Sequence, residues 1–200
     1  SDNKIALYEN DGNQNFTYKI ISSAALYAKS VYAIDLDGDG DVDVLSGSYQ
    51  DNKIAWYENV GSNNFIEYVI STNATNALMV YAEDIDSDGD IDVLSASDYG
   101  KIALYENDGF QNFSNHVITT NADGACSVYS KDIDGDGDQD VMSSFSGPTD
   151  KVGWYENLIL DQLSLHGNVF YDINQNGMFD SLDQGLNNIV LTVTQQNNLS

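Results

Sequence analysis

Short runs of β-branched and aromatic residues recur along this chain, and residues that favour turns separate them. This pattern predicts β-strands. In the first complete unit it predicts four strands, at residues 31–36, 42–49, 53–58 and 65–71. Apolar residues occupy both faces of these strands, as in the run from Ile54 to Tyr57. Each predicted sheet is therefore expected to be covered on both sides.

A seven-residue phrase close to Lys-Ile-Ala-Leu-Tyr-Glu-Asn occurs four times, at residues 4–10, 53–59, 101–107 and 151–157. Successive copies start 49, 48 and 50 residues apart. Internal periods of 20 to 50 residues indicate solenoids, propellers or arrays. We therefore predict an all-β fold of four-stranded blades, for which a β-propeller is the natural closed form. Small residues at 46–48 and 95–97 would let neighbouring blades approach closely.

A nine-residue segment rich in aspartate, here called the Asp loop, lies between the first and second predicted strands of three units. Side chains at loop positions 1, 3, 5 and 9 and the backbone carbonyl at position 7 can converge on one hard cation. The sequence thus predicts three Ca²⁺ sites. The predicted ligands are Asp35, Asp37, Asp39, Asp43 and the Asp41 carbonyl; Asp84, Asp86, Asp88, Asp92 and the Asp90 carbonyl; and Asp132, Asp134, Asp136, Asp140 and the Asp138 carbonyl.

Charge and turn chemistry both favour an ion in the Asp loops. Two carboxylates 4 Å apart repel by about 1 kcal/mol in water and about 4 kcal/mol near a protein surface, and a divalent cation reverses the sign. Glycine at position 6 permits the sharp turn. Position 12 carries Ser46, Ser95 and Ser143 in place of the Glu of a helix–loop–helix calcium site. The alternative, a solvated acidic run without an ion, does not explain why glycine stays in register.

The Asp loop, the Tyr-Glu-Asn strand and the Asn-Asp-Gly turn resemble the FG-GAP/VCBS repeat family over roughly residues 1–157. The resemblance implies calcium-bearing propeller blades, usually seven in a closed ring. This chain starts within a blade, with strands at 4–10 and 16–22, continues with two full blades, and has three clear strands before Leu158. We expect either further blades upstream or an open arc whose edges pair with another molecule.

A different pattern begins at His166 and reads as strand, ion loop and strand. It resembles the opening of the calcium-binding B-type β-sandwich repeats of bacterial surface adhesins, truncated here. The predicted organisation is propeller repeats at 1–160, a linker at 161–165 and this segment at 166–200. A polar hairpin without metal is the alternative. The predicted ligands of a fourth Ca²⁺ are Asp172, Asn174, Asn176, the Met178 carbonyl, Asp180 and Asp183.

Seven Lys and Arg against thirty-two Asp and Glu give a net charge of −25, which disfavours nucleic acid and anionic membranes as partners. No run is long and apolar enough for a membrane helix. Cys126 is alone, so we expect an inert thiol and no disulfide. A start at Ser1 without a signal peptide fits a mature secreted product or a fragment of one. Weak calcium loops suit extracellular calcium, and the expected location is secreted or on a bacterial cell surface.

No arrangement of nucleophile, base and acid can be proposed, and we predict that these residues are not an enzyme. His116 is expected to follow the fourth strand of its blade and His166 to begin the next domain. The predicted function is a calcium-stabilised scaffold or adhesive module of a surface or filament protein that self-associates through repeat edges. Alternatives are a recognition propeller for a protein or glycan, or an accessory domain of a secreted hydrolase. Glycosylation acceptors are possible at Asn15, Asn73, Asn112, Asn198 and Ser181.

Overall fold

In a computed structural model the chain divides into two compact units, Ser1–Ile159 and Leu160–Ser200. The structure describes residues 3–146, 151–157, 170–171 and 184–185. The described residues form strands and loops, with no helix among them, so the predicted all-β class is confirmed. Consistent with this, no helix in the described part of the chain is long and apolar enough to cross a membrane.

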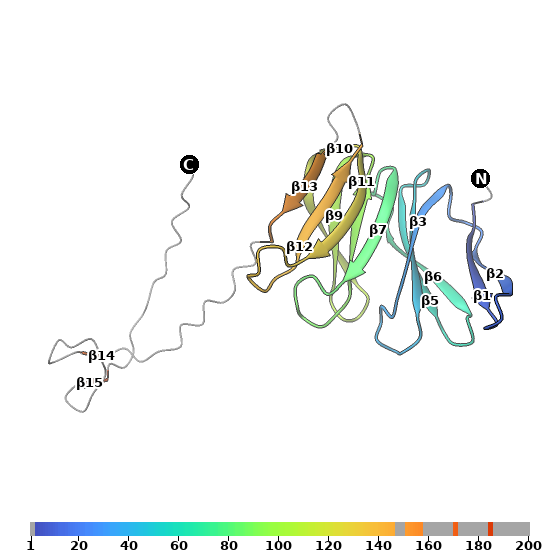
Figure 1. The fold of residues 1–200 in the computed structure, drawn as a ribbon, viewed down its shortest axis with the longest axis horizontal. Helices are drawn as coiled ribbons and strands as arrows, with labels where there is room; N and C mark the ends of the chain where they lie inside the picture. The colour runs from blue at the N-terminus through green and yellow to red at the C-terminus, as the bar shows by residue number, and fades with distance from the viewer. Residues whose placement is uncertain (1–2, 147–150, 158–169, 172–183, 186–200) are drawn as a thin grey trace. The chain divides into compact units, whose positions relative to one another are not determined.

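The described strands of the first unit form four antiparallel sheets that follow one another along the chain (Figure 1). A two-stranded pair comes first, formed by β1 (Ile5–Asn10) and β2 (Phe16–Ser22). The first full blade has the order β3 (Ala28–Ile34), β4 (Asp43–Ser48), β5 (Lys53–Asn59) and β6 (Phe65–Ser71).

The second full blade repeats this order with β7 (Ala77–Glu83), β8 (Asp92–Ser97), β9 (Tyr99–Asn107) and β10 (Phe113–Asp123). A three-stranded blade then contains β11 (Ala125–Lys131), β12 (Asp140–Phe145) and β13 (Lys151–Tyr155). The predicted pair, two full blades and three-stranded blade are thus all confirmed.

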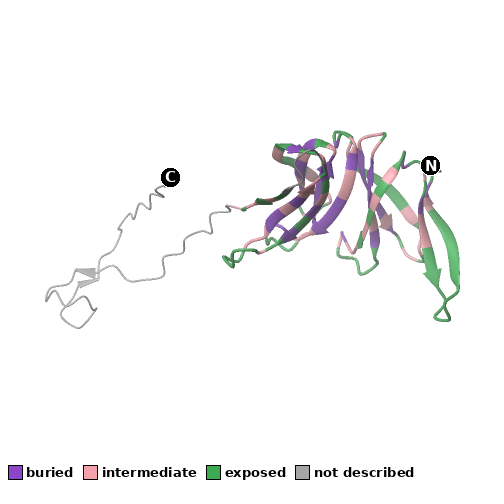
Figure 2. Ribbon diagram, turned by 45° about the horizontal axis from the view of Figure 1, so that its top comes forward, coloured by how far each residue is buried: buried purple, intermediate pink, exposed green. Residues whose placement is uncertain are grey.

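Three hydrophobic clusters lie between consecutive sheets, and the buried residues alternate between them along each central strand (Figure 2). In β5, Ala55 and Tyr57 pack toward the N-terminal pair, while Ile54 and Trp56 pack toward the second full blade. Both faces are therefore covered, as the apolar runs predicted. Burying one such aliphatic or aromatic side chain stabilises the fold by about 1.5–3 kcal/mol.

Gly47 allows the first two full blades to approach closely. A Cβ atom on Gly47 would lie 3.3 Å from the Val80 Cγ1 and 3.6 Å from the Ala77 Cβ, both in the next blade. The equivalent residue of the second full blade is Ala96, which is fully buried. The small residues in the second strand thus serve the packing role that the sequence predicted.

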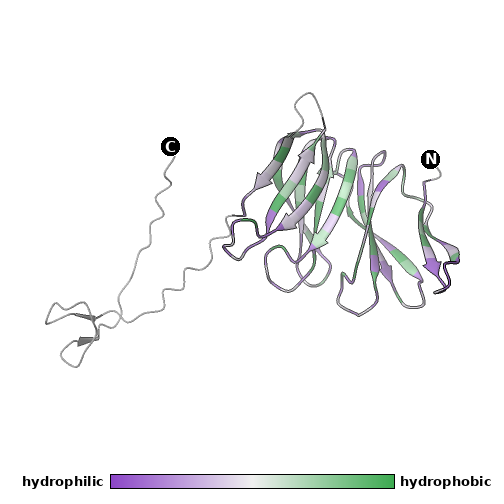
Figure 3. Cartoon of the chain, in the orientation of Figure 1, coloured by the Kyte–Doolittle hydropathy of each residue, from purple (hydrophilic) through white to green (hydrophobic). Residues whose placement is uncertain are grey.

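The first strands of successive blades, β3, β7 and β11, lie next to one another. Tyr32, Tyr81 and Tyr129 occupy the same position in these strands, and their ring centroids are 5.1 Å and 4.8 Å apart. β7 is the most covered of the three because it lies between the other two. In Figure 3 this strand is largely hydrophobic, whereas the loops at the strand ends are hydrophilic.

Strand bounds agree closely with the sequence pattern, with one shift. The strand expected at 31–36 is β3 and runs from Ala28 to Ile34, because Asp35 already belongs to the Asp loop. The prediction for His116 was wrong: it lies within β10, where its Nε2 is 2.8 Å from the Glu106 Oε2 of β9. The longer β10 carries this cross-strand pair in an exposed position.

The second unit contains two described strands, β14 (Phe170–Tyr171) and β15 (Gln184–Gly185), which pair antiparallel. The predicted ion loop from Asp172 to Asp183 lies outside the described residues, as do the linker at 161–165 and most of the segment at 166–200.

Candidate metal centres

The Asp loops join the first and second strands of all three larger blades, and they lie along the lower edge of the first unit in Figure 1. Each loop is folded by its own carboxylates. In the first loop, Asp35 accepts hydrogen bonds from the backbone N–H groups of Gly38 (2.9 Å) and Gly40 (3.0 Å). Asp37 and Asp39 each accept one from the N–H two residues ahead, at 3.2 Å and 2.8 Å.

Glycine at position 6 has a positive φ in every Asp loop, which L side chains rarely adopt. The values are 94° at Gly40, 99° at Gly89 and 106° at Gly137. The sharp turn at this position brings the carboxylates at the start of each loop toward one another.

Position 9 is buried in all three loops, at Asp43, Asp92 and Asp140, each no more than 1% exposed. One carboxylate oxygen of each residue accepts a hydrogen bond from the N–H of position 2, at 3.0–3.1 Å. The other accepts one from the Asn that ends the Tyr-Glu-Asn phrase, at 2.7–2.9 Å. These aspartates therefore fasten the loop to the third strand.

That Asn is a positioning residue that the sequence analysis missed. The side-chain Nδ2 atoms of Asn59, Asn107 and Asn157 each donate to the backbone carbonyl of loop position 8, at 3.2 Å in every blade. The available signal was the presence of Asn at the end of all four phrases, although this Asn lies 16 to 18 residues beyond the carbonyl that it holds.

The structure brings three carboxylate ligand atoms within 4.8 Å of one another in each loop. Positions 1, 3 and 5 form the group in the first and third loops, and Asp92 joins Asp84 and Asp86 in the second. The groups are Asp35, Asp37 and Asp39; Asp84, Asp86 and Asp92; and Asp132, Asp134 and Asp136.

A family model described as the FG-GAP-like repeat matches residues 1–46, 35–95 and 84–143. These matches cover more than half of the chain. The chain belongs to the FG-GAP-like repeat family. No curated protein matches it closely enough to be named as a relative.

The FG-GAP-like repeat is bracketed by Asp loops in this chain. The second and third matches begin at the first aspartate of a loop, and all three end three residues beyond position 9 of the next. One repeat therefore contains three strands of one blade and the first strand of the next.

In the first two Asp loops, the side chain at position 7 lies toward the neighbouring turn of the repeat. A Cβ atom on Gly109, in the β9–β10 turn, would lie 2.5 Å from the Asp90 Oδ2. A Cβ on Gly61, in the matching turn of the first full blade, would lie 3.9 Å from the Asp41 Oδ2. This placement leaves the backbone carbonyl, which the spacing predicts as a ligand, as the group that position 7 can offer.

Burial and mutual repulsion make ionisation of the FG-GAP carboxylates costly. Desolvation raises the pKa of Asp92 to about 6, against the lowering effect of its hydrogen bonds from Asn107 and Ile85. Burial and then the charges of Asp136, Asp140 and Asp134 raise the pKa of Asp138 to about 6. Desolvation also raises the pKa of Asp43 and Asp86. A bound cation would remove this cost.

A cation also fits two otherwise unexplained atoms. The Asp84 Oδ1 and Asp138 Oδ1 atoms are buried and have no hydrogen-bond partner. A buried acceptor without a partner costs about 1–3 kcal/mol. Each candidate group consists of carboxylates, so a hard cation that prefers oxygen ligands suits the donor set.

Proposed function

We propose that this chain is a calcium-stabilised, non-catalytic module of an extracellular scaffold or adhesive protein. The observation that supports it best is the repeated Asp loop, in which the same buried carboxylate, asparagine and glycine recur in three blades with the same contacts. A catalytic site would not need three equivalent copies, whereas a structural ion site is expected in each of the repeated blades.

Calcium suits these loops better than other common metals. Each candidate group contains only carboxylates, and carbonyl and carboxylate oxygens select Mg²⁺, Ca²⁺ or Mn²⁺ over Zn²⁺ and Cu²⁺. Ca²⁺ tolerates six to eight ligands in a flexible arrangement, whereas Mg²⁺ demands near-ideal octahedral geometry. Ca²⁺ sites of weak affinity are filled outside cells, so the proposed location is extracellular.

The direct test is calcium stoichiometry by calorimetry, with Asp84→Ala as the variant. Asp84 contributes both the unpartnered buried oxygen and the acceptor for the Gly89 N–H. We expect one fewer bound Ca²⁺ and a lower melting temperature. Asp108→Ala is the matched control, because Asp108 is an exposed turn aspartate that bonds Asn112 and lies outside the loop. An unchanged stoichiometry in Asp84→Ala would overturn the ligand assignment.

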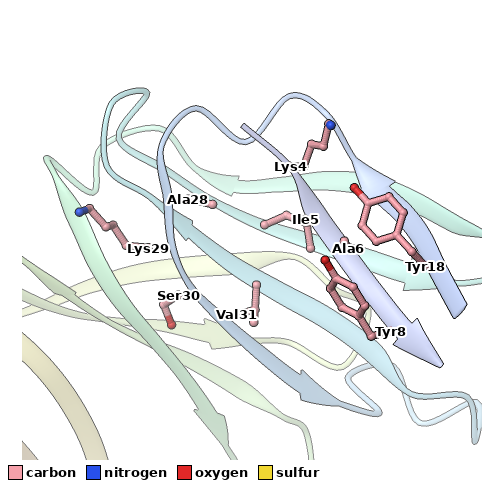
Figure 4. A pocket seen from close by; sticks show the side chains of 9 residues that line it. All are labelled: Lys4, Ile5, Ala6, Tyr8, Tyr18, Ala28, Lys29, Ser30 and Val31. Carbon is pink, nitrogen blue, oxygen red and sulfur yellow. The ribbon is translucent and has the colours of Figure 1, made fainter. Parts of the chain in front are cut away.

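We further propose that the scaffold self-associates through its repeat edges. Among the described residues, β1 and β2 form a pair at one edge of the repeats. A cavity of about 320 Å³ lies beside this pair and is lined by residues of β1, β2 and β3 (Figure 4). Tyr8 and Tyr18 border this cavity and are 62% and 49% exposed. An open strand edge with exposed aromatic residues is a template for pairing with a second copy.

Electron microscopy and sedimentation with millimolar Ca²⁺, and again after chelation, test the self-association. Polymers that dissociate without Ca²⁺ are expected. Single particles in both conditions would exclude self-association and would favour the second candidate, a recognition module. That candidate is favoured by an aromatic pocket between the two full blades, described below.

A further inference from the structure

The repeats of this chain can be compared with one another, because a residue that the blade fold needs is expected to recur in every copy. Two aromatic residues, Tyr68 and Phe110, depart from their counterparts at one junction, between the two full blades, where they lie beside Trp56. Trp56 stands where β1 and β9 carry Leu7 and Leu104 and where β13 carries Trp154. Tyr68 replaces Lys19 and His116, and Phe110 replaces Asn13 and Ser62, at the matching positions. The blade fold does not require these aromatic side chains.

The three residues meet around a cavity of about 460 Å³, here called the aromatic pocket. Its walls come from β5 and β6 of the first full blade, from Asp37 in the first Asp loop, and from the β9–β10 turn and the start of β10 in the second. Residues far apart in the sequence therefore build one pocket across the blade junction.

The aromatic rings form a platform and a side wall. Trp56 and Tyr68 are cross-strand neighbours whose ring centroids are 4.9 Å apart with 26° between the planes. Trp56 is only 4% exposed and fixes the orientation of Tyr68, which is 43% exposed. Phe110 is 81% exposed, a high value for so large an apolar side chain, and it lies on the turn that faces the platform.

The charged groups of the aromatic pocket are both negative. Asp37 and Glu58 line it, and the Tyr68 hydroxyl donates a hydrogen bond to the Glu58 carboxylate. None of the residues that line the pocket is positively charged. In the second full blade the counterpart of Glu58 is Glu106, which has His116 as a partner 2.8 Å away. Tyr68 thus stands where the second full blade carries the basic His116. The Glu58 carboxylate therefore has no basic partner among the residues that line the pocket.

We propose that the aromatic pocket binds an alkylammonium cation, such as a lysine side chain or a quaternary ammonium group. Aromatic faces attract such cations through the ring quadrupole, and adjacent carboxylates add direct charge attraction. Glu58 is not among the calcium ligands assigned above, so its charge persists when the first Asp loop is loaded. The net charge of −25 favours the approach of a cation further.

A neutral sugar fits the pocket less well. Sugar hydroxyl groups both donate and accept hydrogen bonds, whereas carboxylates only accept. The charged lining therefore favours a ligand that carries its own positive charge.

The test uses the whole chain in millimolar Ca²⁺, with Trp154→Phe as the background so that Trp56 is the remaining tryptophan. Choline is titrated and followed by Trp56 fluorescence, with 3,3-dimethylbutan-1-ol as its neutral isostere and sodium chloride for ionic strength. We expect a saturable change with choline alone. Nα-acetyl-lysine amide and phosphatidylcholine vesicles, titrated in the same way, distinguish a protein source of the cation from a lipid source.

Two variants use residues that the other repeats already carry, so the fold is expected to tolerate them. Phe110→Ser should weaken choline binding about fivefold or more, and Tyr68→Lys should abolish it by supplying an internal cation. Tyr99→Ser is the control, because Tyr99 is 69% exposed but does not line the pocket. Equal binding of the neutral isostere, binding only of a chito-oligosaccharide, or no binding at all would each overturn the proposal. None of these outcomes bears on calcium, which the stoichiometry experiment tests separately.

Discussion

The seven-residue phrase recurs because its two ends hold neighbouring parts of the repeat together. At its start, the Lys53 Nζ donates to the Ala24 carbonyl (3.2 Å) and the Lys101 Nζ to the Asn73 carbonyl (3.3 Å), both in the link from the preceding sheet. At its end, Asn107 holds the Asp loop of its own blade. A single strand therefore ties the junction at one end of the blade to the candidate ion site at the other.

Asn107→Ala should destabilise the protein by about 1–3 kcal/mol and weaken Ca²⁺ binding at one site, because it removes the hydrogen bond to the Ile91 carbonyl and the Oδ1 acceptor of the Gly109 and Gln111 N–H groups. The backbone hydrogen bond to Asp92 remains, so the loop should keep its course. Urea denaturation in Ca²⁺ measures the change. Asn112→Ala removes a side-chain hydrogen bond of similar length on the exposed β9–β10 turn and serves as the control. Equal effects of the two substitutions would show that Asn107 has no special role.

The raised pKa of Asp92 predicts an unusual pH dependence for the metal-free protein. Its folded-state pKa of about 6 lies above the ordinary value of 3.8 for an aspartate, so protonation favours the folded state. The free energy of unfolding should therefore fall by about 1–3 kcal/mol as the pH rises from about 4 to 7. Denaturation in chelator across this pH range tests the sign of the change in the free energy of unfolding, and Asp92→Asn should flatten the profile.

In Ca²⁺ the free energy of unfolding should instead rise with pH, because the ion needs the deprotonated form of Asp92. A metal-free protein that gains stability with pH would contradict the assignment.

The spacing between the two full blades depends on the second strand of the first of them. Gly47 faces Val80 and Ala77 of the next blade, and the next copy of the position holds Ala96. The pattern of small residues thus sets how close two sheets can come, while the larger residues of the third strand fill the space on both sides.

Gly47→Val should destabilise the junction of the two full blades by about 1–3 kcal/mol, because its branched side chain must displace Val80. Gly47→Ala should cost much less, since Ala96 is accommodated at the same position of the next blade. Thermal unfolding in Ca²⁺ compares the two. A valine variant as stable as the alanine variant would show that the junction is loosely packed.

At the scale of the whole first unit, the sheets form a linear stack in which each blade contacts mainly its neighbours. Stability in such an array is approximately a sum of blade and junction contributions. The proposed ions act within every blade, because an Asp loop connects two strands of each blade and is held by a third.

Calcium should consequently raise the free energy of unfolding in proportion to the number of filled loops. At a Ca²⁺ concentration 100 times the dissociation constant, each site contributes about 2.7 kcal/mol. Denaturation midpoints measured over a Ca²⁺ titration test this dependence, and Mg²⁺ at equal concentration should stabilise less because it needs octahedral geometry. Identical midpoints with Ca²⁺ and with chelator would rule out a structural role for the ion.

Strand positions and loop register could be predicted from the sequence because both depend on local patterns. Apolar runs give the strands, and the glycine at position 6 is required by the backbone at that point, where φ is positive. The start of β3 at Ala28 could not be predicted, because Ala28 carries no strong strand signal and is placed by pairing with Ser48 of β4. The place of His116 within β10 also depended on pairing, with β9.

The sequence by itself determined the repeat, the all-β blades and the aspartates that form each loop, since these follow from short-range spacing. Only the tertiary structure decided that Asn59, Asn107 and Asn157 hold the loops, and that Trp56, Tyr68 and Phe110 meet in one pocket. The physical reason is distance along the chain. Contacts between strands and between blades join residues 12 to 54 positions apart, and no local pattern encodes which of them meet.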